Sequence, residues 1–290
     1  MSIIKDAPTE WKRVARPQSD EYDTNVVLSY ARRLGLTLPS ISPDEPRLIG
    51  TDVAVRSGLS WDPKRYVSVA ANHRKIKRGM GLLSTWKDGH RQATRVLAAV
   101  YVVSDRASPA QVWGGTSGIG PLGFGTIGTT MDCPGGFAQA IVHEMAHHKL
   151  RGLGVGFTSS TNLVTNDPSE LCQSPIRYDC LRPMTAVLHA QYSFTYVTEL
   201  NIHIIRSATS DEGDRAAAGH SLARDLSKLE FGMNIIDCHV RLDAAGRDFM
   251  KGFSQWLADT LDTGHEVLNE VAIAPVSFVH PLNPIKAAAS

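Results

Sequence analysis

Residues 134–154 read PGGFAQAIVHEMAHHKLRGLG, and the rest of the chain is best interpreted outward from this stretch. A proline and two glycines open it, apolar residues then recur at helical spacing, and Lys149 and Arg151 lie near its end, before Gly152 and Gly154. Basic residues in the last turn and a glycine after it are typical of a helix C-terminus. The stretch therefore predicts one well-bounded α-helix.

The middle of this helix carries the pattern HExxH, formed by His143, Glu144 and His147. Residues four apart on an α-helix are rotated by about 400°, so the two imidazoles lie on one face, one turn apart. Two nitrogens placed in this way can hold one metal ion. We therefore predict a mononuclear metal site, and His148 adds a further imidazole next to it in the sequence.

Composition and charge exclude several classes of protein. Of the 290 residues, 42% are hydrophobic and 20% are charged, which is ordinary for a globular protein with a large core. The net charge is +1, so no attraction to nucleic acid is expected, and the basic run at 73–78 is interpreted as a solvated helix face. No signal peptide or apolar run of about 18 residues is present, which predicts a cytoplasmic protein that binds no membrane.

The cysteines give little evidence of a metal site of their own. Cys133, Cys172, Cys180 and Cys238 include no CxxC pair. This spacing fits reduced thiols better than a disulfide framework or a structural zinc site. Cys172 and Cys180 lie near the proposed site in sequence but are weaker candidate ligands than the histidines.

The hydrophobic pattern predicts a mainly helical α+β protein with a small β-sheet, in which the HExxH helix packs against a second long helix. A strand followed by an HExxH helix is a zincin-like arrangement. We expect a flexible arm at 1–20 and a single catalytic domain at 21–290, with the metal site within about 126–206. The expected strands are 96–103 and 126–131, and the expected helices are 21–34, part of 67–86 with a break near Gly79 and Gly81, 184–205, 211–240 and 243–262.

A glycine-rich run at 114–128 contains a match to GxGxxG from Gly118 to Gly123. The dinucleotide-binding fingerprint must open a helix after a strand, whereas Pro121 interrupts this run and an extended segment follows it. We therefore interpret the run as a mobile loop over the site and not as a nucleotide-binding turn.

A catalytic metal needs a third protein ligand and open positions for water or substrate. The long helix expected after Pro183 offers His189 and Glu199, which lie 42 and 52 residues past His147. Glu199 would complete the ligand set of a zinc peptidase or of a 2-His-1-carboxylate iron site, whereas His189 would give three histidines.

Two arginines bear on this choice. Arg177 and Arg182 precede the long helix, and a guanidinium is the usual clamp for a carboxylate. At 1.5 Å per residue, Arg182 lies about 10 Å from His189 and about 25 Å from Glu199 along the helix. A small dicarboxylate that chelates the metal at one end reaches Arg182 only if His189 is the ligand, yet both choices stay open.

Three segments carry a resemblance to a known family. HEMAHHKL, SPIRYDCLRP and VLHAQYSF follow one another within residues 137–200, about a fifth of the chain. In this order they resemble the HExxH-type peptide β-hydroxylases, which depend on iron and 2-oxoglutarate. The sequence departs from the family where Ile176 replaces an aromatic residue after Ser-Pro and where the two arginines are one residue further apart, so the resemblance does not decide between the arginines.

The resemblance implies an Fe(II) site at His143 and His147 that His189 completes. It also implies that 2-oxoglutarate chelates the iron and extends its far carboxylate to Arg177 or Arg182. The reaction with O2 would hydroxylate an amino-acid side chain, at Cβ, of a peptide or amino-acid substrate in natural-product biosynthesis.

Two other functions fit the same residues. In a zinc metallopeptidase, Glu144 would act as general base on a metal-bound water and Glu199 would be the third ligand. In a non-catalytic helical interaction protein, the chain would bind no stoichiometric metal. Under the oxygenase hypothesis Glu144 need not be a base and would orient the substrate or hold a water molecule.

Overall fold

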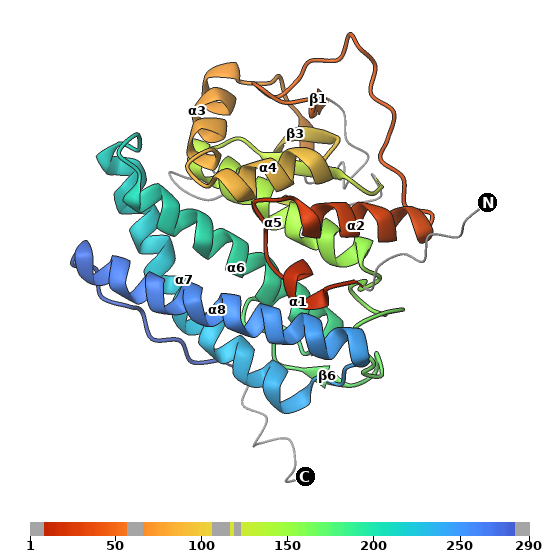
Figure 1. Ribbon diagram of the computed structural model, residues 1–290. Coiled ribbons are helices and arrows are strands. Elements are labelled where there is room, and N and C mark those ends of the chain that lie inside the picture. The colour runs from red at the N-terminus through yellow and green to blue at the C-terminus, as the bar shows by residue number, and fades with distance from the viewer. Residues whose placement is uncertain (1–8, 57–65, 106–116, 119–122, 282–290) are drawn as a thin grey trace.

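The fold combines eight helices with a small β-sheet in the part of the chain that the structure describes, which makes it a mainly helical α+β protein (Figure 1). This computed structural model describes residues 9–56, 66–105, 117–118 and 123–281. The helices are α1 (Trp11–Val14), α2 (Tyr22–Arg33), α3 (His73–Leu83), α4 (Lys87–Val96), α5 (Pro134–Gly152), α6 (Met184–Arg206), α7 (Glu212–His239) and α8 (Ala244–Glu270). The strands are β1 (Ala54–Arg56), β2 (Tyr66–Ser68), β3 (Ala99–Asp105), β4 (Ser117–Gly118), β5 (Thr126–Thr130), β6 (Leu171–Cys172) and β7 (Arg182–Pro183).

Strand β3 lies at the centre of the larger sheet, where its valines are buried. Strands β1 and β5 pair with it in parallel, while β2 pairs with its far end in the antiparallel direction and β4 pairs antiparallel with β5. Ala99 lies opposite Thr126, so β3 and β5 start level with each other. The strand expected at 126–131 is therefore confirmed. The strand expected at 96–103 is confirmed from Ala99 onward, whereas Val96 is the last residue of α4.

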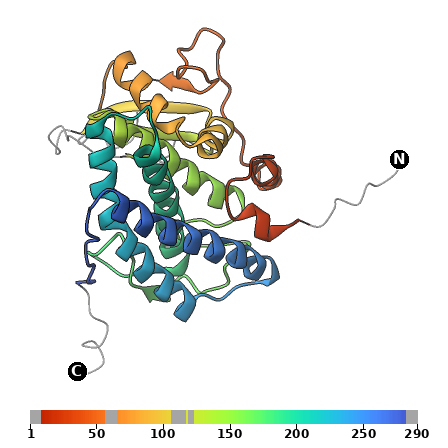
Figure 2. The same cartoon turned by 60° about the vertical axis from the view of Figure 1, so that its left-hand side comes forward.

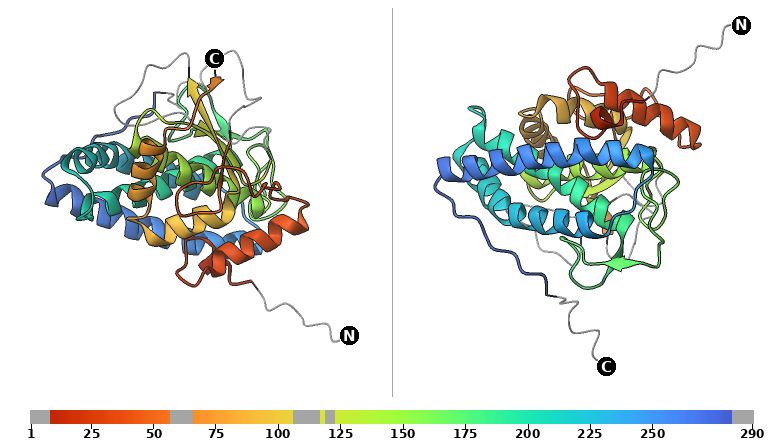
Figure 3. Two further views of the ribbon diagram at one scale, coloured as in Figure 1. Left: turned by 90° about the horizontal axis from the view of Figure 1, so that it is seen from above. Right: turned by 60° about the horizontal axis from the view of Figure 1, so that its bottom comes forward.

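Helix α5 lies in the middle of the molecule, between the sheet with its helices and a layer of long helices (Figures 1 and 2). It contacts α2, α3, α4 and β5 on one side and α6 on the other. Helix α6 in turn packs against α7 and α8, which run side by side in Figure 3. Because the helix is covered by neighbours along most of its length, Phe137, Ile141 and Met145 are buried.

A buried polar network joins α5 to its neighbours. The Lys149 ammonium, which is fully buried, donates to the Asp23 carboxylate at 2.7 Å and to the Tyr196 hydroxyl at 3.1 Å. The Tyr196 hydroxyl donates to Gln92 Oε1 at 2.5 Å, and the Gln92 amide donates back to Asp23. The network closes on itself, so these polar groups are satisfied without water and tie α2, α4 and α6 to α5.

Two features of the N-terminal third differ from the sequence-based expectation. Helix α3 runs without a break, because Gly79 serves close packing: a Cβ there would lie 2.8 Å from Phe137 Cδ1 and 2.9 Å from the Pro134 oxygen. Helix α4, which the pattern did not indicate, follows it. In the expected arm, residues 1–8 lie outside the described part, but α1 packs against α8 and Val14 is fully buried.

The C-terminal tail (residues 274–281) folds back along α7. The Val276 N–H donates to the Ala223 oxygen at 2.9 Å. Further along, the Phe278 ring lies 5.5 Å from the ring of Tyr178, in the loop between β6 and β7. None of the described helices is both long and apolar enough to cross a membrane.

Candidate metal centre

Helix α5 begins where strand β5 leaves the sheet, and local chemistry fixes that start. The Cys133 sulfur accepts a hydrogen bond from the Gly136 N–H at 3.2 Å, which caps the helix. Pro134 takes the first helical position, where a missing N–H costs no hydrogen bond. The helix expected within 134–154 is confirmed as α5, which ends at Gly152 and carries HExxH in its second half.

His143, Glu144 and His147 form one group in the structure. The two Nε2 atoms lie 3.1 Å apart, and a Glu144 oxygen lies 3.8 Å from the Nε2 of His143. One ligand atom from each of the three residues can be chosen so that all lie within 4.8 Å of one another. The structure therefore brings the HExxH side chains together as a possible metal-binding group.

Burial sets the protonation of these imidazoles. It lowers the pKa of His143 to about 4, and it lowers the pKa of His147 well below its ordinary value, with the neighbouring His143 and His189 adding to the effect. Burial likewise lowers the pKa of His189 to about 3. All three rings are neutral at pH 7, and a neutral imidazole keeps a lone pair with which to bind a metal.

His189 contacts the opposite edge of His147. Its Nδ1 lies 3.1 Å from Nδ1 of His147, and its Nε2 lies 2.9 Å from the backbone oxygen of Val155. Since a carbonyl oxygen only accepts, Nε2 of His189 carries the proton, and Nδ1 of His147 then donates to His189. This tautomer leaves the lone pair of His147 on Nε2, the atom that faces His143.

A cavity of about 380 Å³ opens over the group. Both arginines singled out in the sequence line it, together with the three HExxH residues. Strand β6 pairs with β7, with Cys172 opposite Arg182, so this short ladder closes the base of the loop that carries Arg177. The loop therefore lies at the same cavity as the histidines.

The two arginines differ in their partners. Arg177 donates to both oxygens of Asp179, at 2.9 and 2.7 Å, and this pair raises the pKa of Arg177 and lowers that of Asp179 to about 2. Among the described residues, Arg182 has no carboxylate within ion-pair distance and only a longer-range attraction to Asp179. Arg182 is therefore the better placed of the two to receive a ligand carboxylate.

Other residues from the sequence analysis lie elsewhere. Glu199 is not brought to the histidines: its Oε2 accepts from Thr260 at 2.8 Å, and the residue lines a different cavity. His148 faces the sheet, where its Nε2 donates to the Thr126 oxygen at 2.9 Å. Cys172 and Cys180 are not in the HExxH group, and the four cysteines are free thiols.

The cavity also has apolar walls that the sequence analysis missed. Phe157, Ile176 and Phe194 line it, and the Phe194 ring meets the His143 ring edge-on at 5.3 Å. A signal for part of this wall is present in α6, where Ala186, Ala190 and Phe194 recur every four residues. Phe157 lies in a polar loop, where no periodicity marks it.

The donor set fits a transition metal. Neutral imidazole nitrogens and a carboxylate oxygen are the donors that zinc and iron accept in proteins. Here the two Nε2 atoms lie 3.1 Å apart, and the nearby carboxylate of Glu144 adds an oxygen donor. Among the described residues, no other group of three such side chains has this geometry. Of the run at 114–128 that was expected as a mobile loop over the site, 114–116 and 119–122 lie outside the described residues. The expectation is wrong for Ser117–Gly118, which form β4 and pair with β5.

Comparison with known proteins does not identify the chain. No protein-family model matches it, and no curated protein matches it at a significant level. The chemistry of the cavity is therefore the observation from which its function is inferred.

Proposed function

We propose that this protein is an Fe(II)- and 2-oxoglutarate-dependent oxygenase that hydroxylates an amino-acid side chain of a peptide or amino-acid substrate. The observation that carries the proposal is one cavity that holds both the converging nitrogens of His143 and His147 and the guanidinium of Arg182. A site for a metal and a clamp for a carboxylate are the two requirements of a 2-oxo acid cosubstrate.

His143 and His147 would hold the iron. Bound iron with a 2-oxo acid would supply the activation of O2 needed to hydroxylate a C–H bond. The third ligand stays a prediction with two candidates in the structure. Glu144 already belongs to the group, whereas His189 would need to turn its ring away from Val155 to share the metal. Orienting His147 is the role that the present position of His189 supports.

Arg182 would bind the distal carboxylate of 2-oxoglutarate. Its guanidinium can offer two parallel N–H donors to a carboxylate, and no residue in the described part of the chain already occupies them with an ion pair. Arg177 would compete poorly, because a ligand carboxylate must displace Asp179 from it. The arginine thus orients the cosubstrate between the loop and the metal group.

The apolar walls would receive the substrate side chain. Phe194 contacts His143 edge-on and Phe157 contacts His147 edge-on, and apolar rings beside a reactive centre would help to exclude water from it. A side chain resting against these walls would present its Cβ to the metal group. Strand β5 precedes the HExxH helix in the chain, and α6 packs against that helix. This order supports the proposal of a zincin-like arrangement with the site at the α5–α6 interface.

An anaerobic titration tests the proposal. Addition of Fe(II) and 2-oxoglutarate to the metal-free protein should give one bound iron and a visible charge-transfer band at about 500 nm. The band should be lost in His143→Ala. It should be kept in the control variant Glu199→Ala, because Glu199 lies on α6 and lines a different cavity. A protein that binds no stoichiometric metal, or one whose band survives loss of His143, would contradict the proposal.

A zinc metallopeptidase is the second candidate, and the position of Glu144 favours it. Its carboxylate lies beside the histidines, where it can deprotonate a water molecule. However, Glu199, the third ligand that this hypothesis predicts, lines another cavity. If the protein retains zinc tightly, gives no band with iron, and hydrolyses peptides until Glu144→Gln abolishes that activity with zinc still bound, the peptidase replaces the oxygenase.

A further inference from the structure

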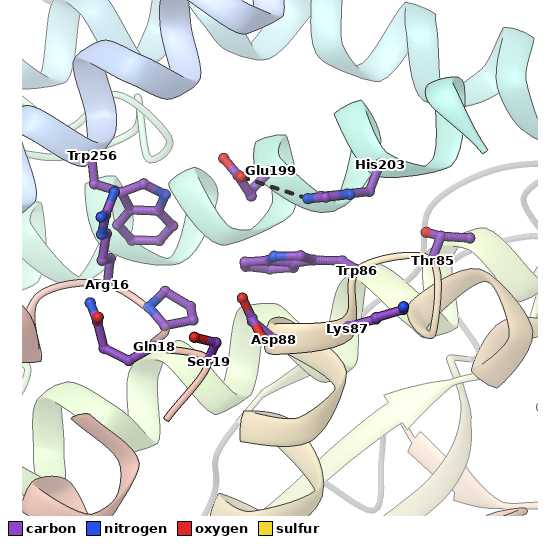
Figure 4. Close-up of a pocket in the computed structure, with 11 residues that line it drawn as sticks. Arg16, Gln18, Ser19, Thr85, Trp86, Lys87, Asp88, Glu199, His203 and Trp256 are labelled. Carbon is purple, nitrogen blue, oxygen red and sulfur yellow. Dashed lines mark ion pairs between the residues drawn. The ribbon is translucent and has the colours of Figure 1, made fainter. Parts of the chain in front are cut away.

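A second cavity lies on the other side of α6, apart from the metal centre (Figure 4). It has a volume of about 530 Å³ and shares no lining residue with the metal cavity. Its walls come from the segment after α1, from the junction of α3 and α4, and from α6 and α8. Figure 4 shows Glu199 and His203 of α6 above the ring of Trp86, with Trp256 across the cavity.

Two tryptophans give this cavity rigid aromatic walls. Trp86 and Trp256 are each only 5% exposed, and both pack against Tyr196, at ring distances of 5.5 and 5.0 Å. The His203 ring lies nearly parallel to Trp86, with 13° between the planes. Because their neighbours hold them, the two indoles are in place before any ligand binds. Indole rings attract cations, through the negative charge on their faces, and also bind alkyl groups.

Glu199 adds a carboxylate to this aromatic wall. Its side chain is 23% exposed, and its Oε2 accepts one hydrogen bond from Thr260 at 2.8 Å. The nearest basic group is His203, whose Nε2 lies 3.8 Å from Oε1, and within the described residues no lysine or arginine forms an ion pair with Glu199. A partly buried carboxylate without a close permanent cation leaves room for the cation of a ligand.

The other charged groups of the cavity do not supply that cation. Asp88 already pairs with Arg91 at 2.9 Å, so it adds little negative charge. Arg16 is 51% exposed and lies 3.9 Å from Asp259, while Lys87 is exposed at the rim. Charges as exposed as these are screened by solvent and salt. Glu199 therefore carries the least compensated charge within the cavity.

We propose that this cavity binds a small organic cation, an alkylguanidinium or alkylammonium group, with its charge on Glu199 and its alkyl part on Trp86 and Trp256. The carboxylate determines the sign of the charge that is accepted, and the indoles determine that the cation is organic and not a bare metal ion. This site is independent of the metal centre and of the reaction proposed there.

A titration of the full-length protein with methylguanidinium, followed by calorimetry, tests this site. N-methylurea is the neutral isostere, and both are used at constant ionic strength. We expect saturable binding of methylguanidinium with a Kd of about 1 mM and binding of N-methylurea at least about tenfold weaker. Equal binding of the two probes, or no saturation of the cation, would overturn the proposal.

Two variants and a control assign the binding to the cavity. Glu199→Gln keeps an acceptor for Thr260 but removes the charge, and it should weaken methylguanidinium binding at least about tenfold. Glu266→Gln, an exposed carboxylate on α8, should leave the Kd unchanged. Arg16→Gln should leave cation binding unchanged or strengthen it. Loss of binding in Arg16→Gln, or acetate binding in place of the cation, would show an anion site instead.

Discussion

Two polar clusters lie within six residues of each other on helix α5, and they behave in opposite ways. Lys149 and its partners Asp23 and Tyr196 are fully buried, and every polar group there faces another. The cluster of His143 and His147 instead lines a cavity. A closed network of buried polar groups holds helices together, whereas a polar cluster that borders a cavity is accessible to a ligand.

The electrostatics of the two clusters differ in the same way. Burial alone would lower the pKa of Lys149, but the Asp23 carboxylate and Tyr192 outweigh it, and the pKa lies above its ordinary value. No carboxylate raises the pKa values of His143 and His147 enough to offset burial, so both pKa values lie below the ordinary value. One cluster is therefore charged at neutral pH and the other is neutral.

Replacement of Lys149 should have the largest effect on stability. Lys149→Met leaves the Asp23 carboxylate buried without its cation, which typically costs about 3–5 kcal/mol of unfolding free energy. Urea unfolding of the metal-free protein measures this cost. The double variant Lys149→Met with Asp23→Asn should recover part of the loss, and no recovery would show that the ion pair is not its source.

The arginines should differ in cosubstrate binding. Arg182→Gln removes the proposed carboxylate clamp, and loss of a charged hydrogen bond of about 1.5–3 kcal/mol weakens 2-oxoglutarate binding about 10- to 150-fold. Arg177→Gln is the matched control, because that side chain is held by Asp179, and we expect a change below about threefold. Titration of the iron-loaded protein gives both dissociation constants, and the reverse order would assign the clamp to Arg177.

Replacement of His189 tests whether this residue orients His147 or binds the metal itself. If it orients His147 from the far edge of the ring, His189→Gln should weaken Fe(II) binding about 10- to 100-fold while one metal ion still binds at saturation. Metal titration with absorption or fluorescence readout measures the affinity and the stoichiometry. Complete loss of stoichiometric binding would instead make His189 the third ligand, as the family resemblance implies.

His148 should contribute a smaller, pH-dependent effect. Burial lowers its pKa to about 4 in the folded protein, against about 6.5 in an unfolded chain. Between these values the unfolded state binds more protons, so the stability that neutral His148 provides is present at pH 7 and falls as the pH drops below 6.5. At pH 5 the loss reaches at most about 2 kcal/mol.

Comparison of the wild type with His148→Gln between pH 7 and 5 isolates that contribution. The variant should lose part of the wild-type dependence of unfolding free energy on pH, because one buried imidazole no longer titrates. An unchanged slope would mean that His148 does not reach its low pKa in the folded protein. Metal-free protein is required, since metal release at low pH adds its own slope.

The sequence predicted those parts of the fold whose signals are local. The bounds of α5 followed from Pro134, the basic last turn and Gly152, and the valine run predicted β3. The break at Gly79 was wrong because a glycine within a helix has the same sequence signature whether it ends the helix or allows close packing. Only the position of Phe137 on a distant segment separates the two cases.

The candidate site was predictable to a similar extent. The HExxH spacing alone was enough to predict that His143 and His147 lie side by side, because one helix carries both. The positions of His189 and Glu199 depend on how α6 is rotated against α5 and on the Val155 carbonyl in the following loop, which no periodicity encodes. The difference between Arg177 and Arg182 likewise depends on Asp179 and on the β6–β7 pairing, which only the folded structure provides.

The C-terminal tail has a practical consequence for anyone who prepares this protein. Phe278 and His280 pack against Tyr178, the residue directly after Arg177. A recombinant version shortened after α8, or fused closely to an affinity tag there, loses or crowds these rings at the loop beside the cavity. A preparation in which this cavity binds its ligands weakly should therefore be re-examined with residues 271–281 retained and the purification tag placed away from them.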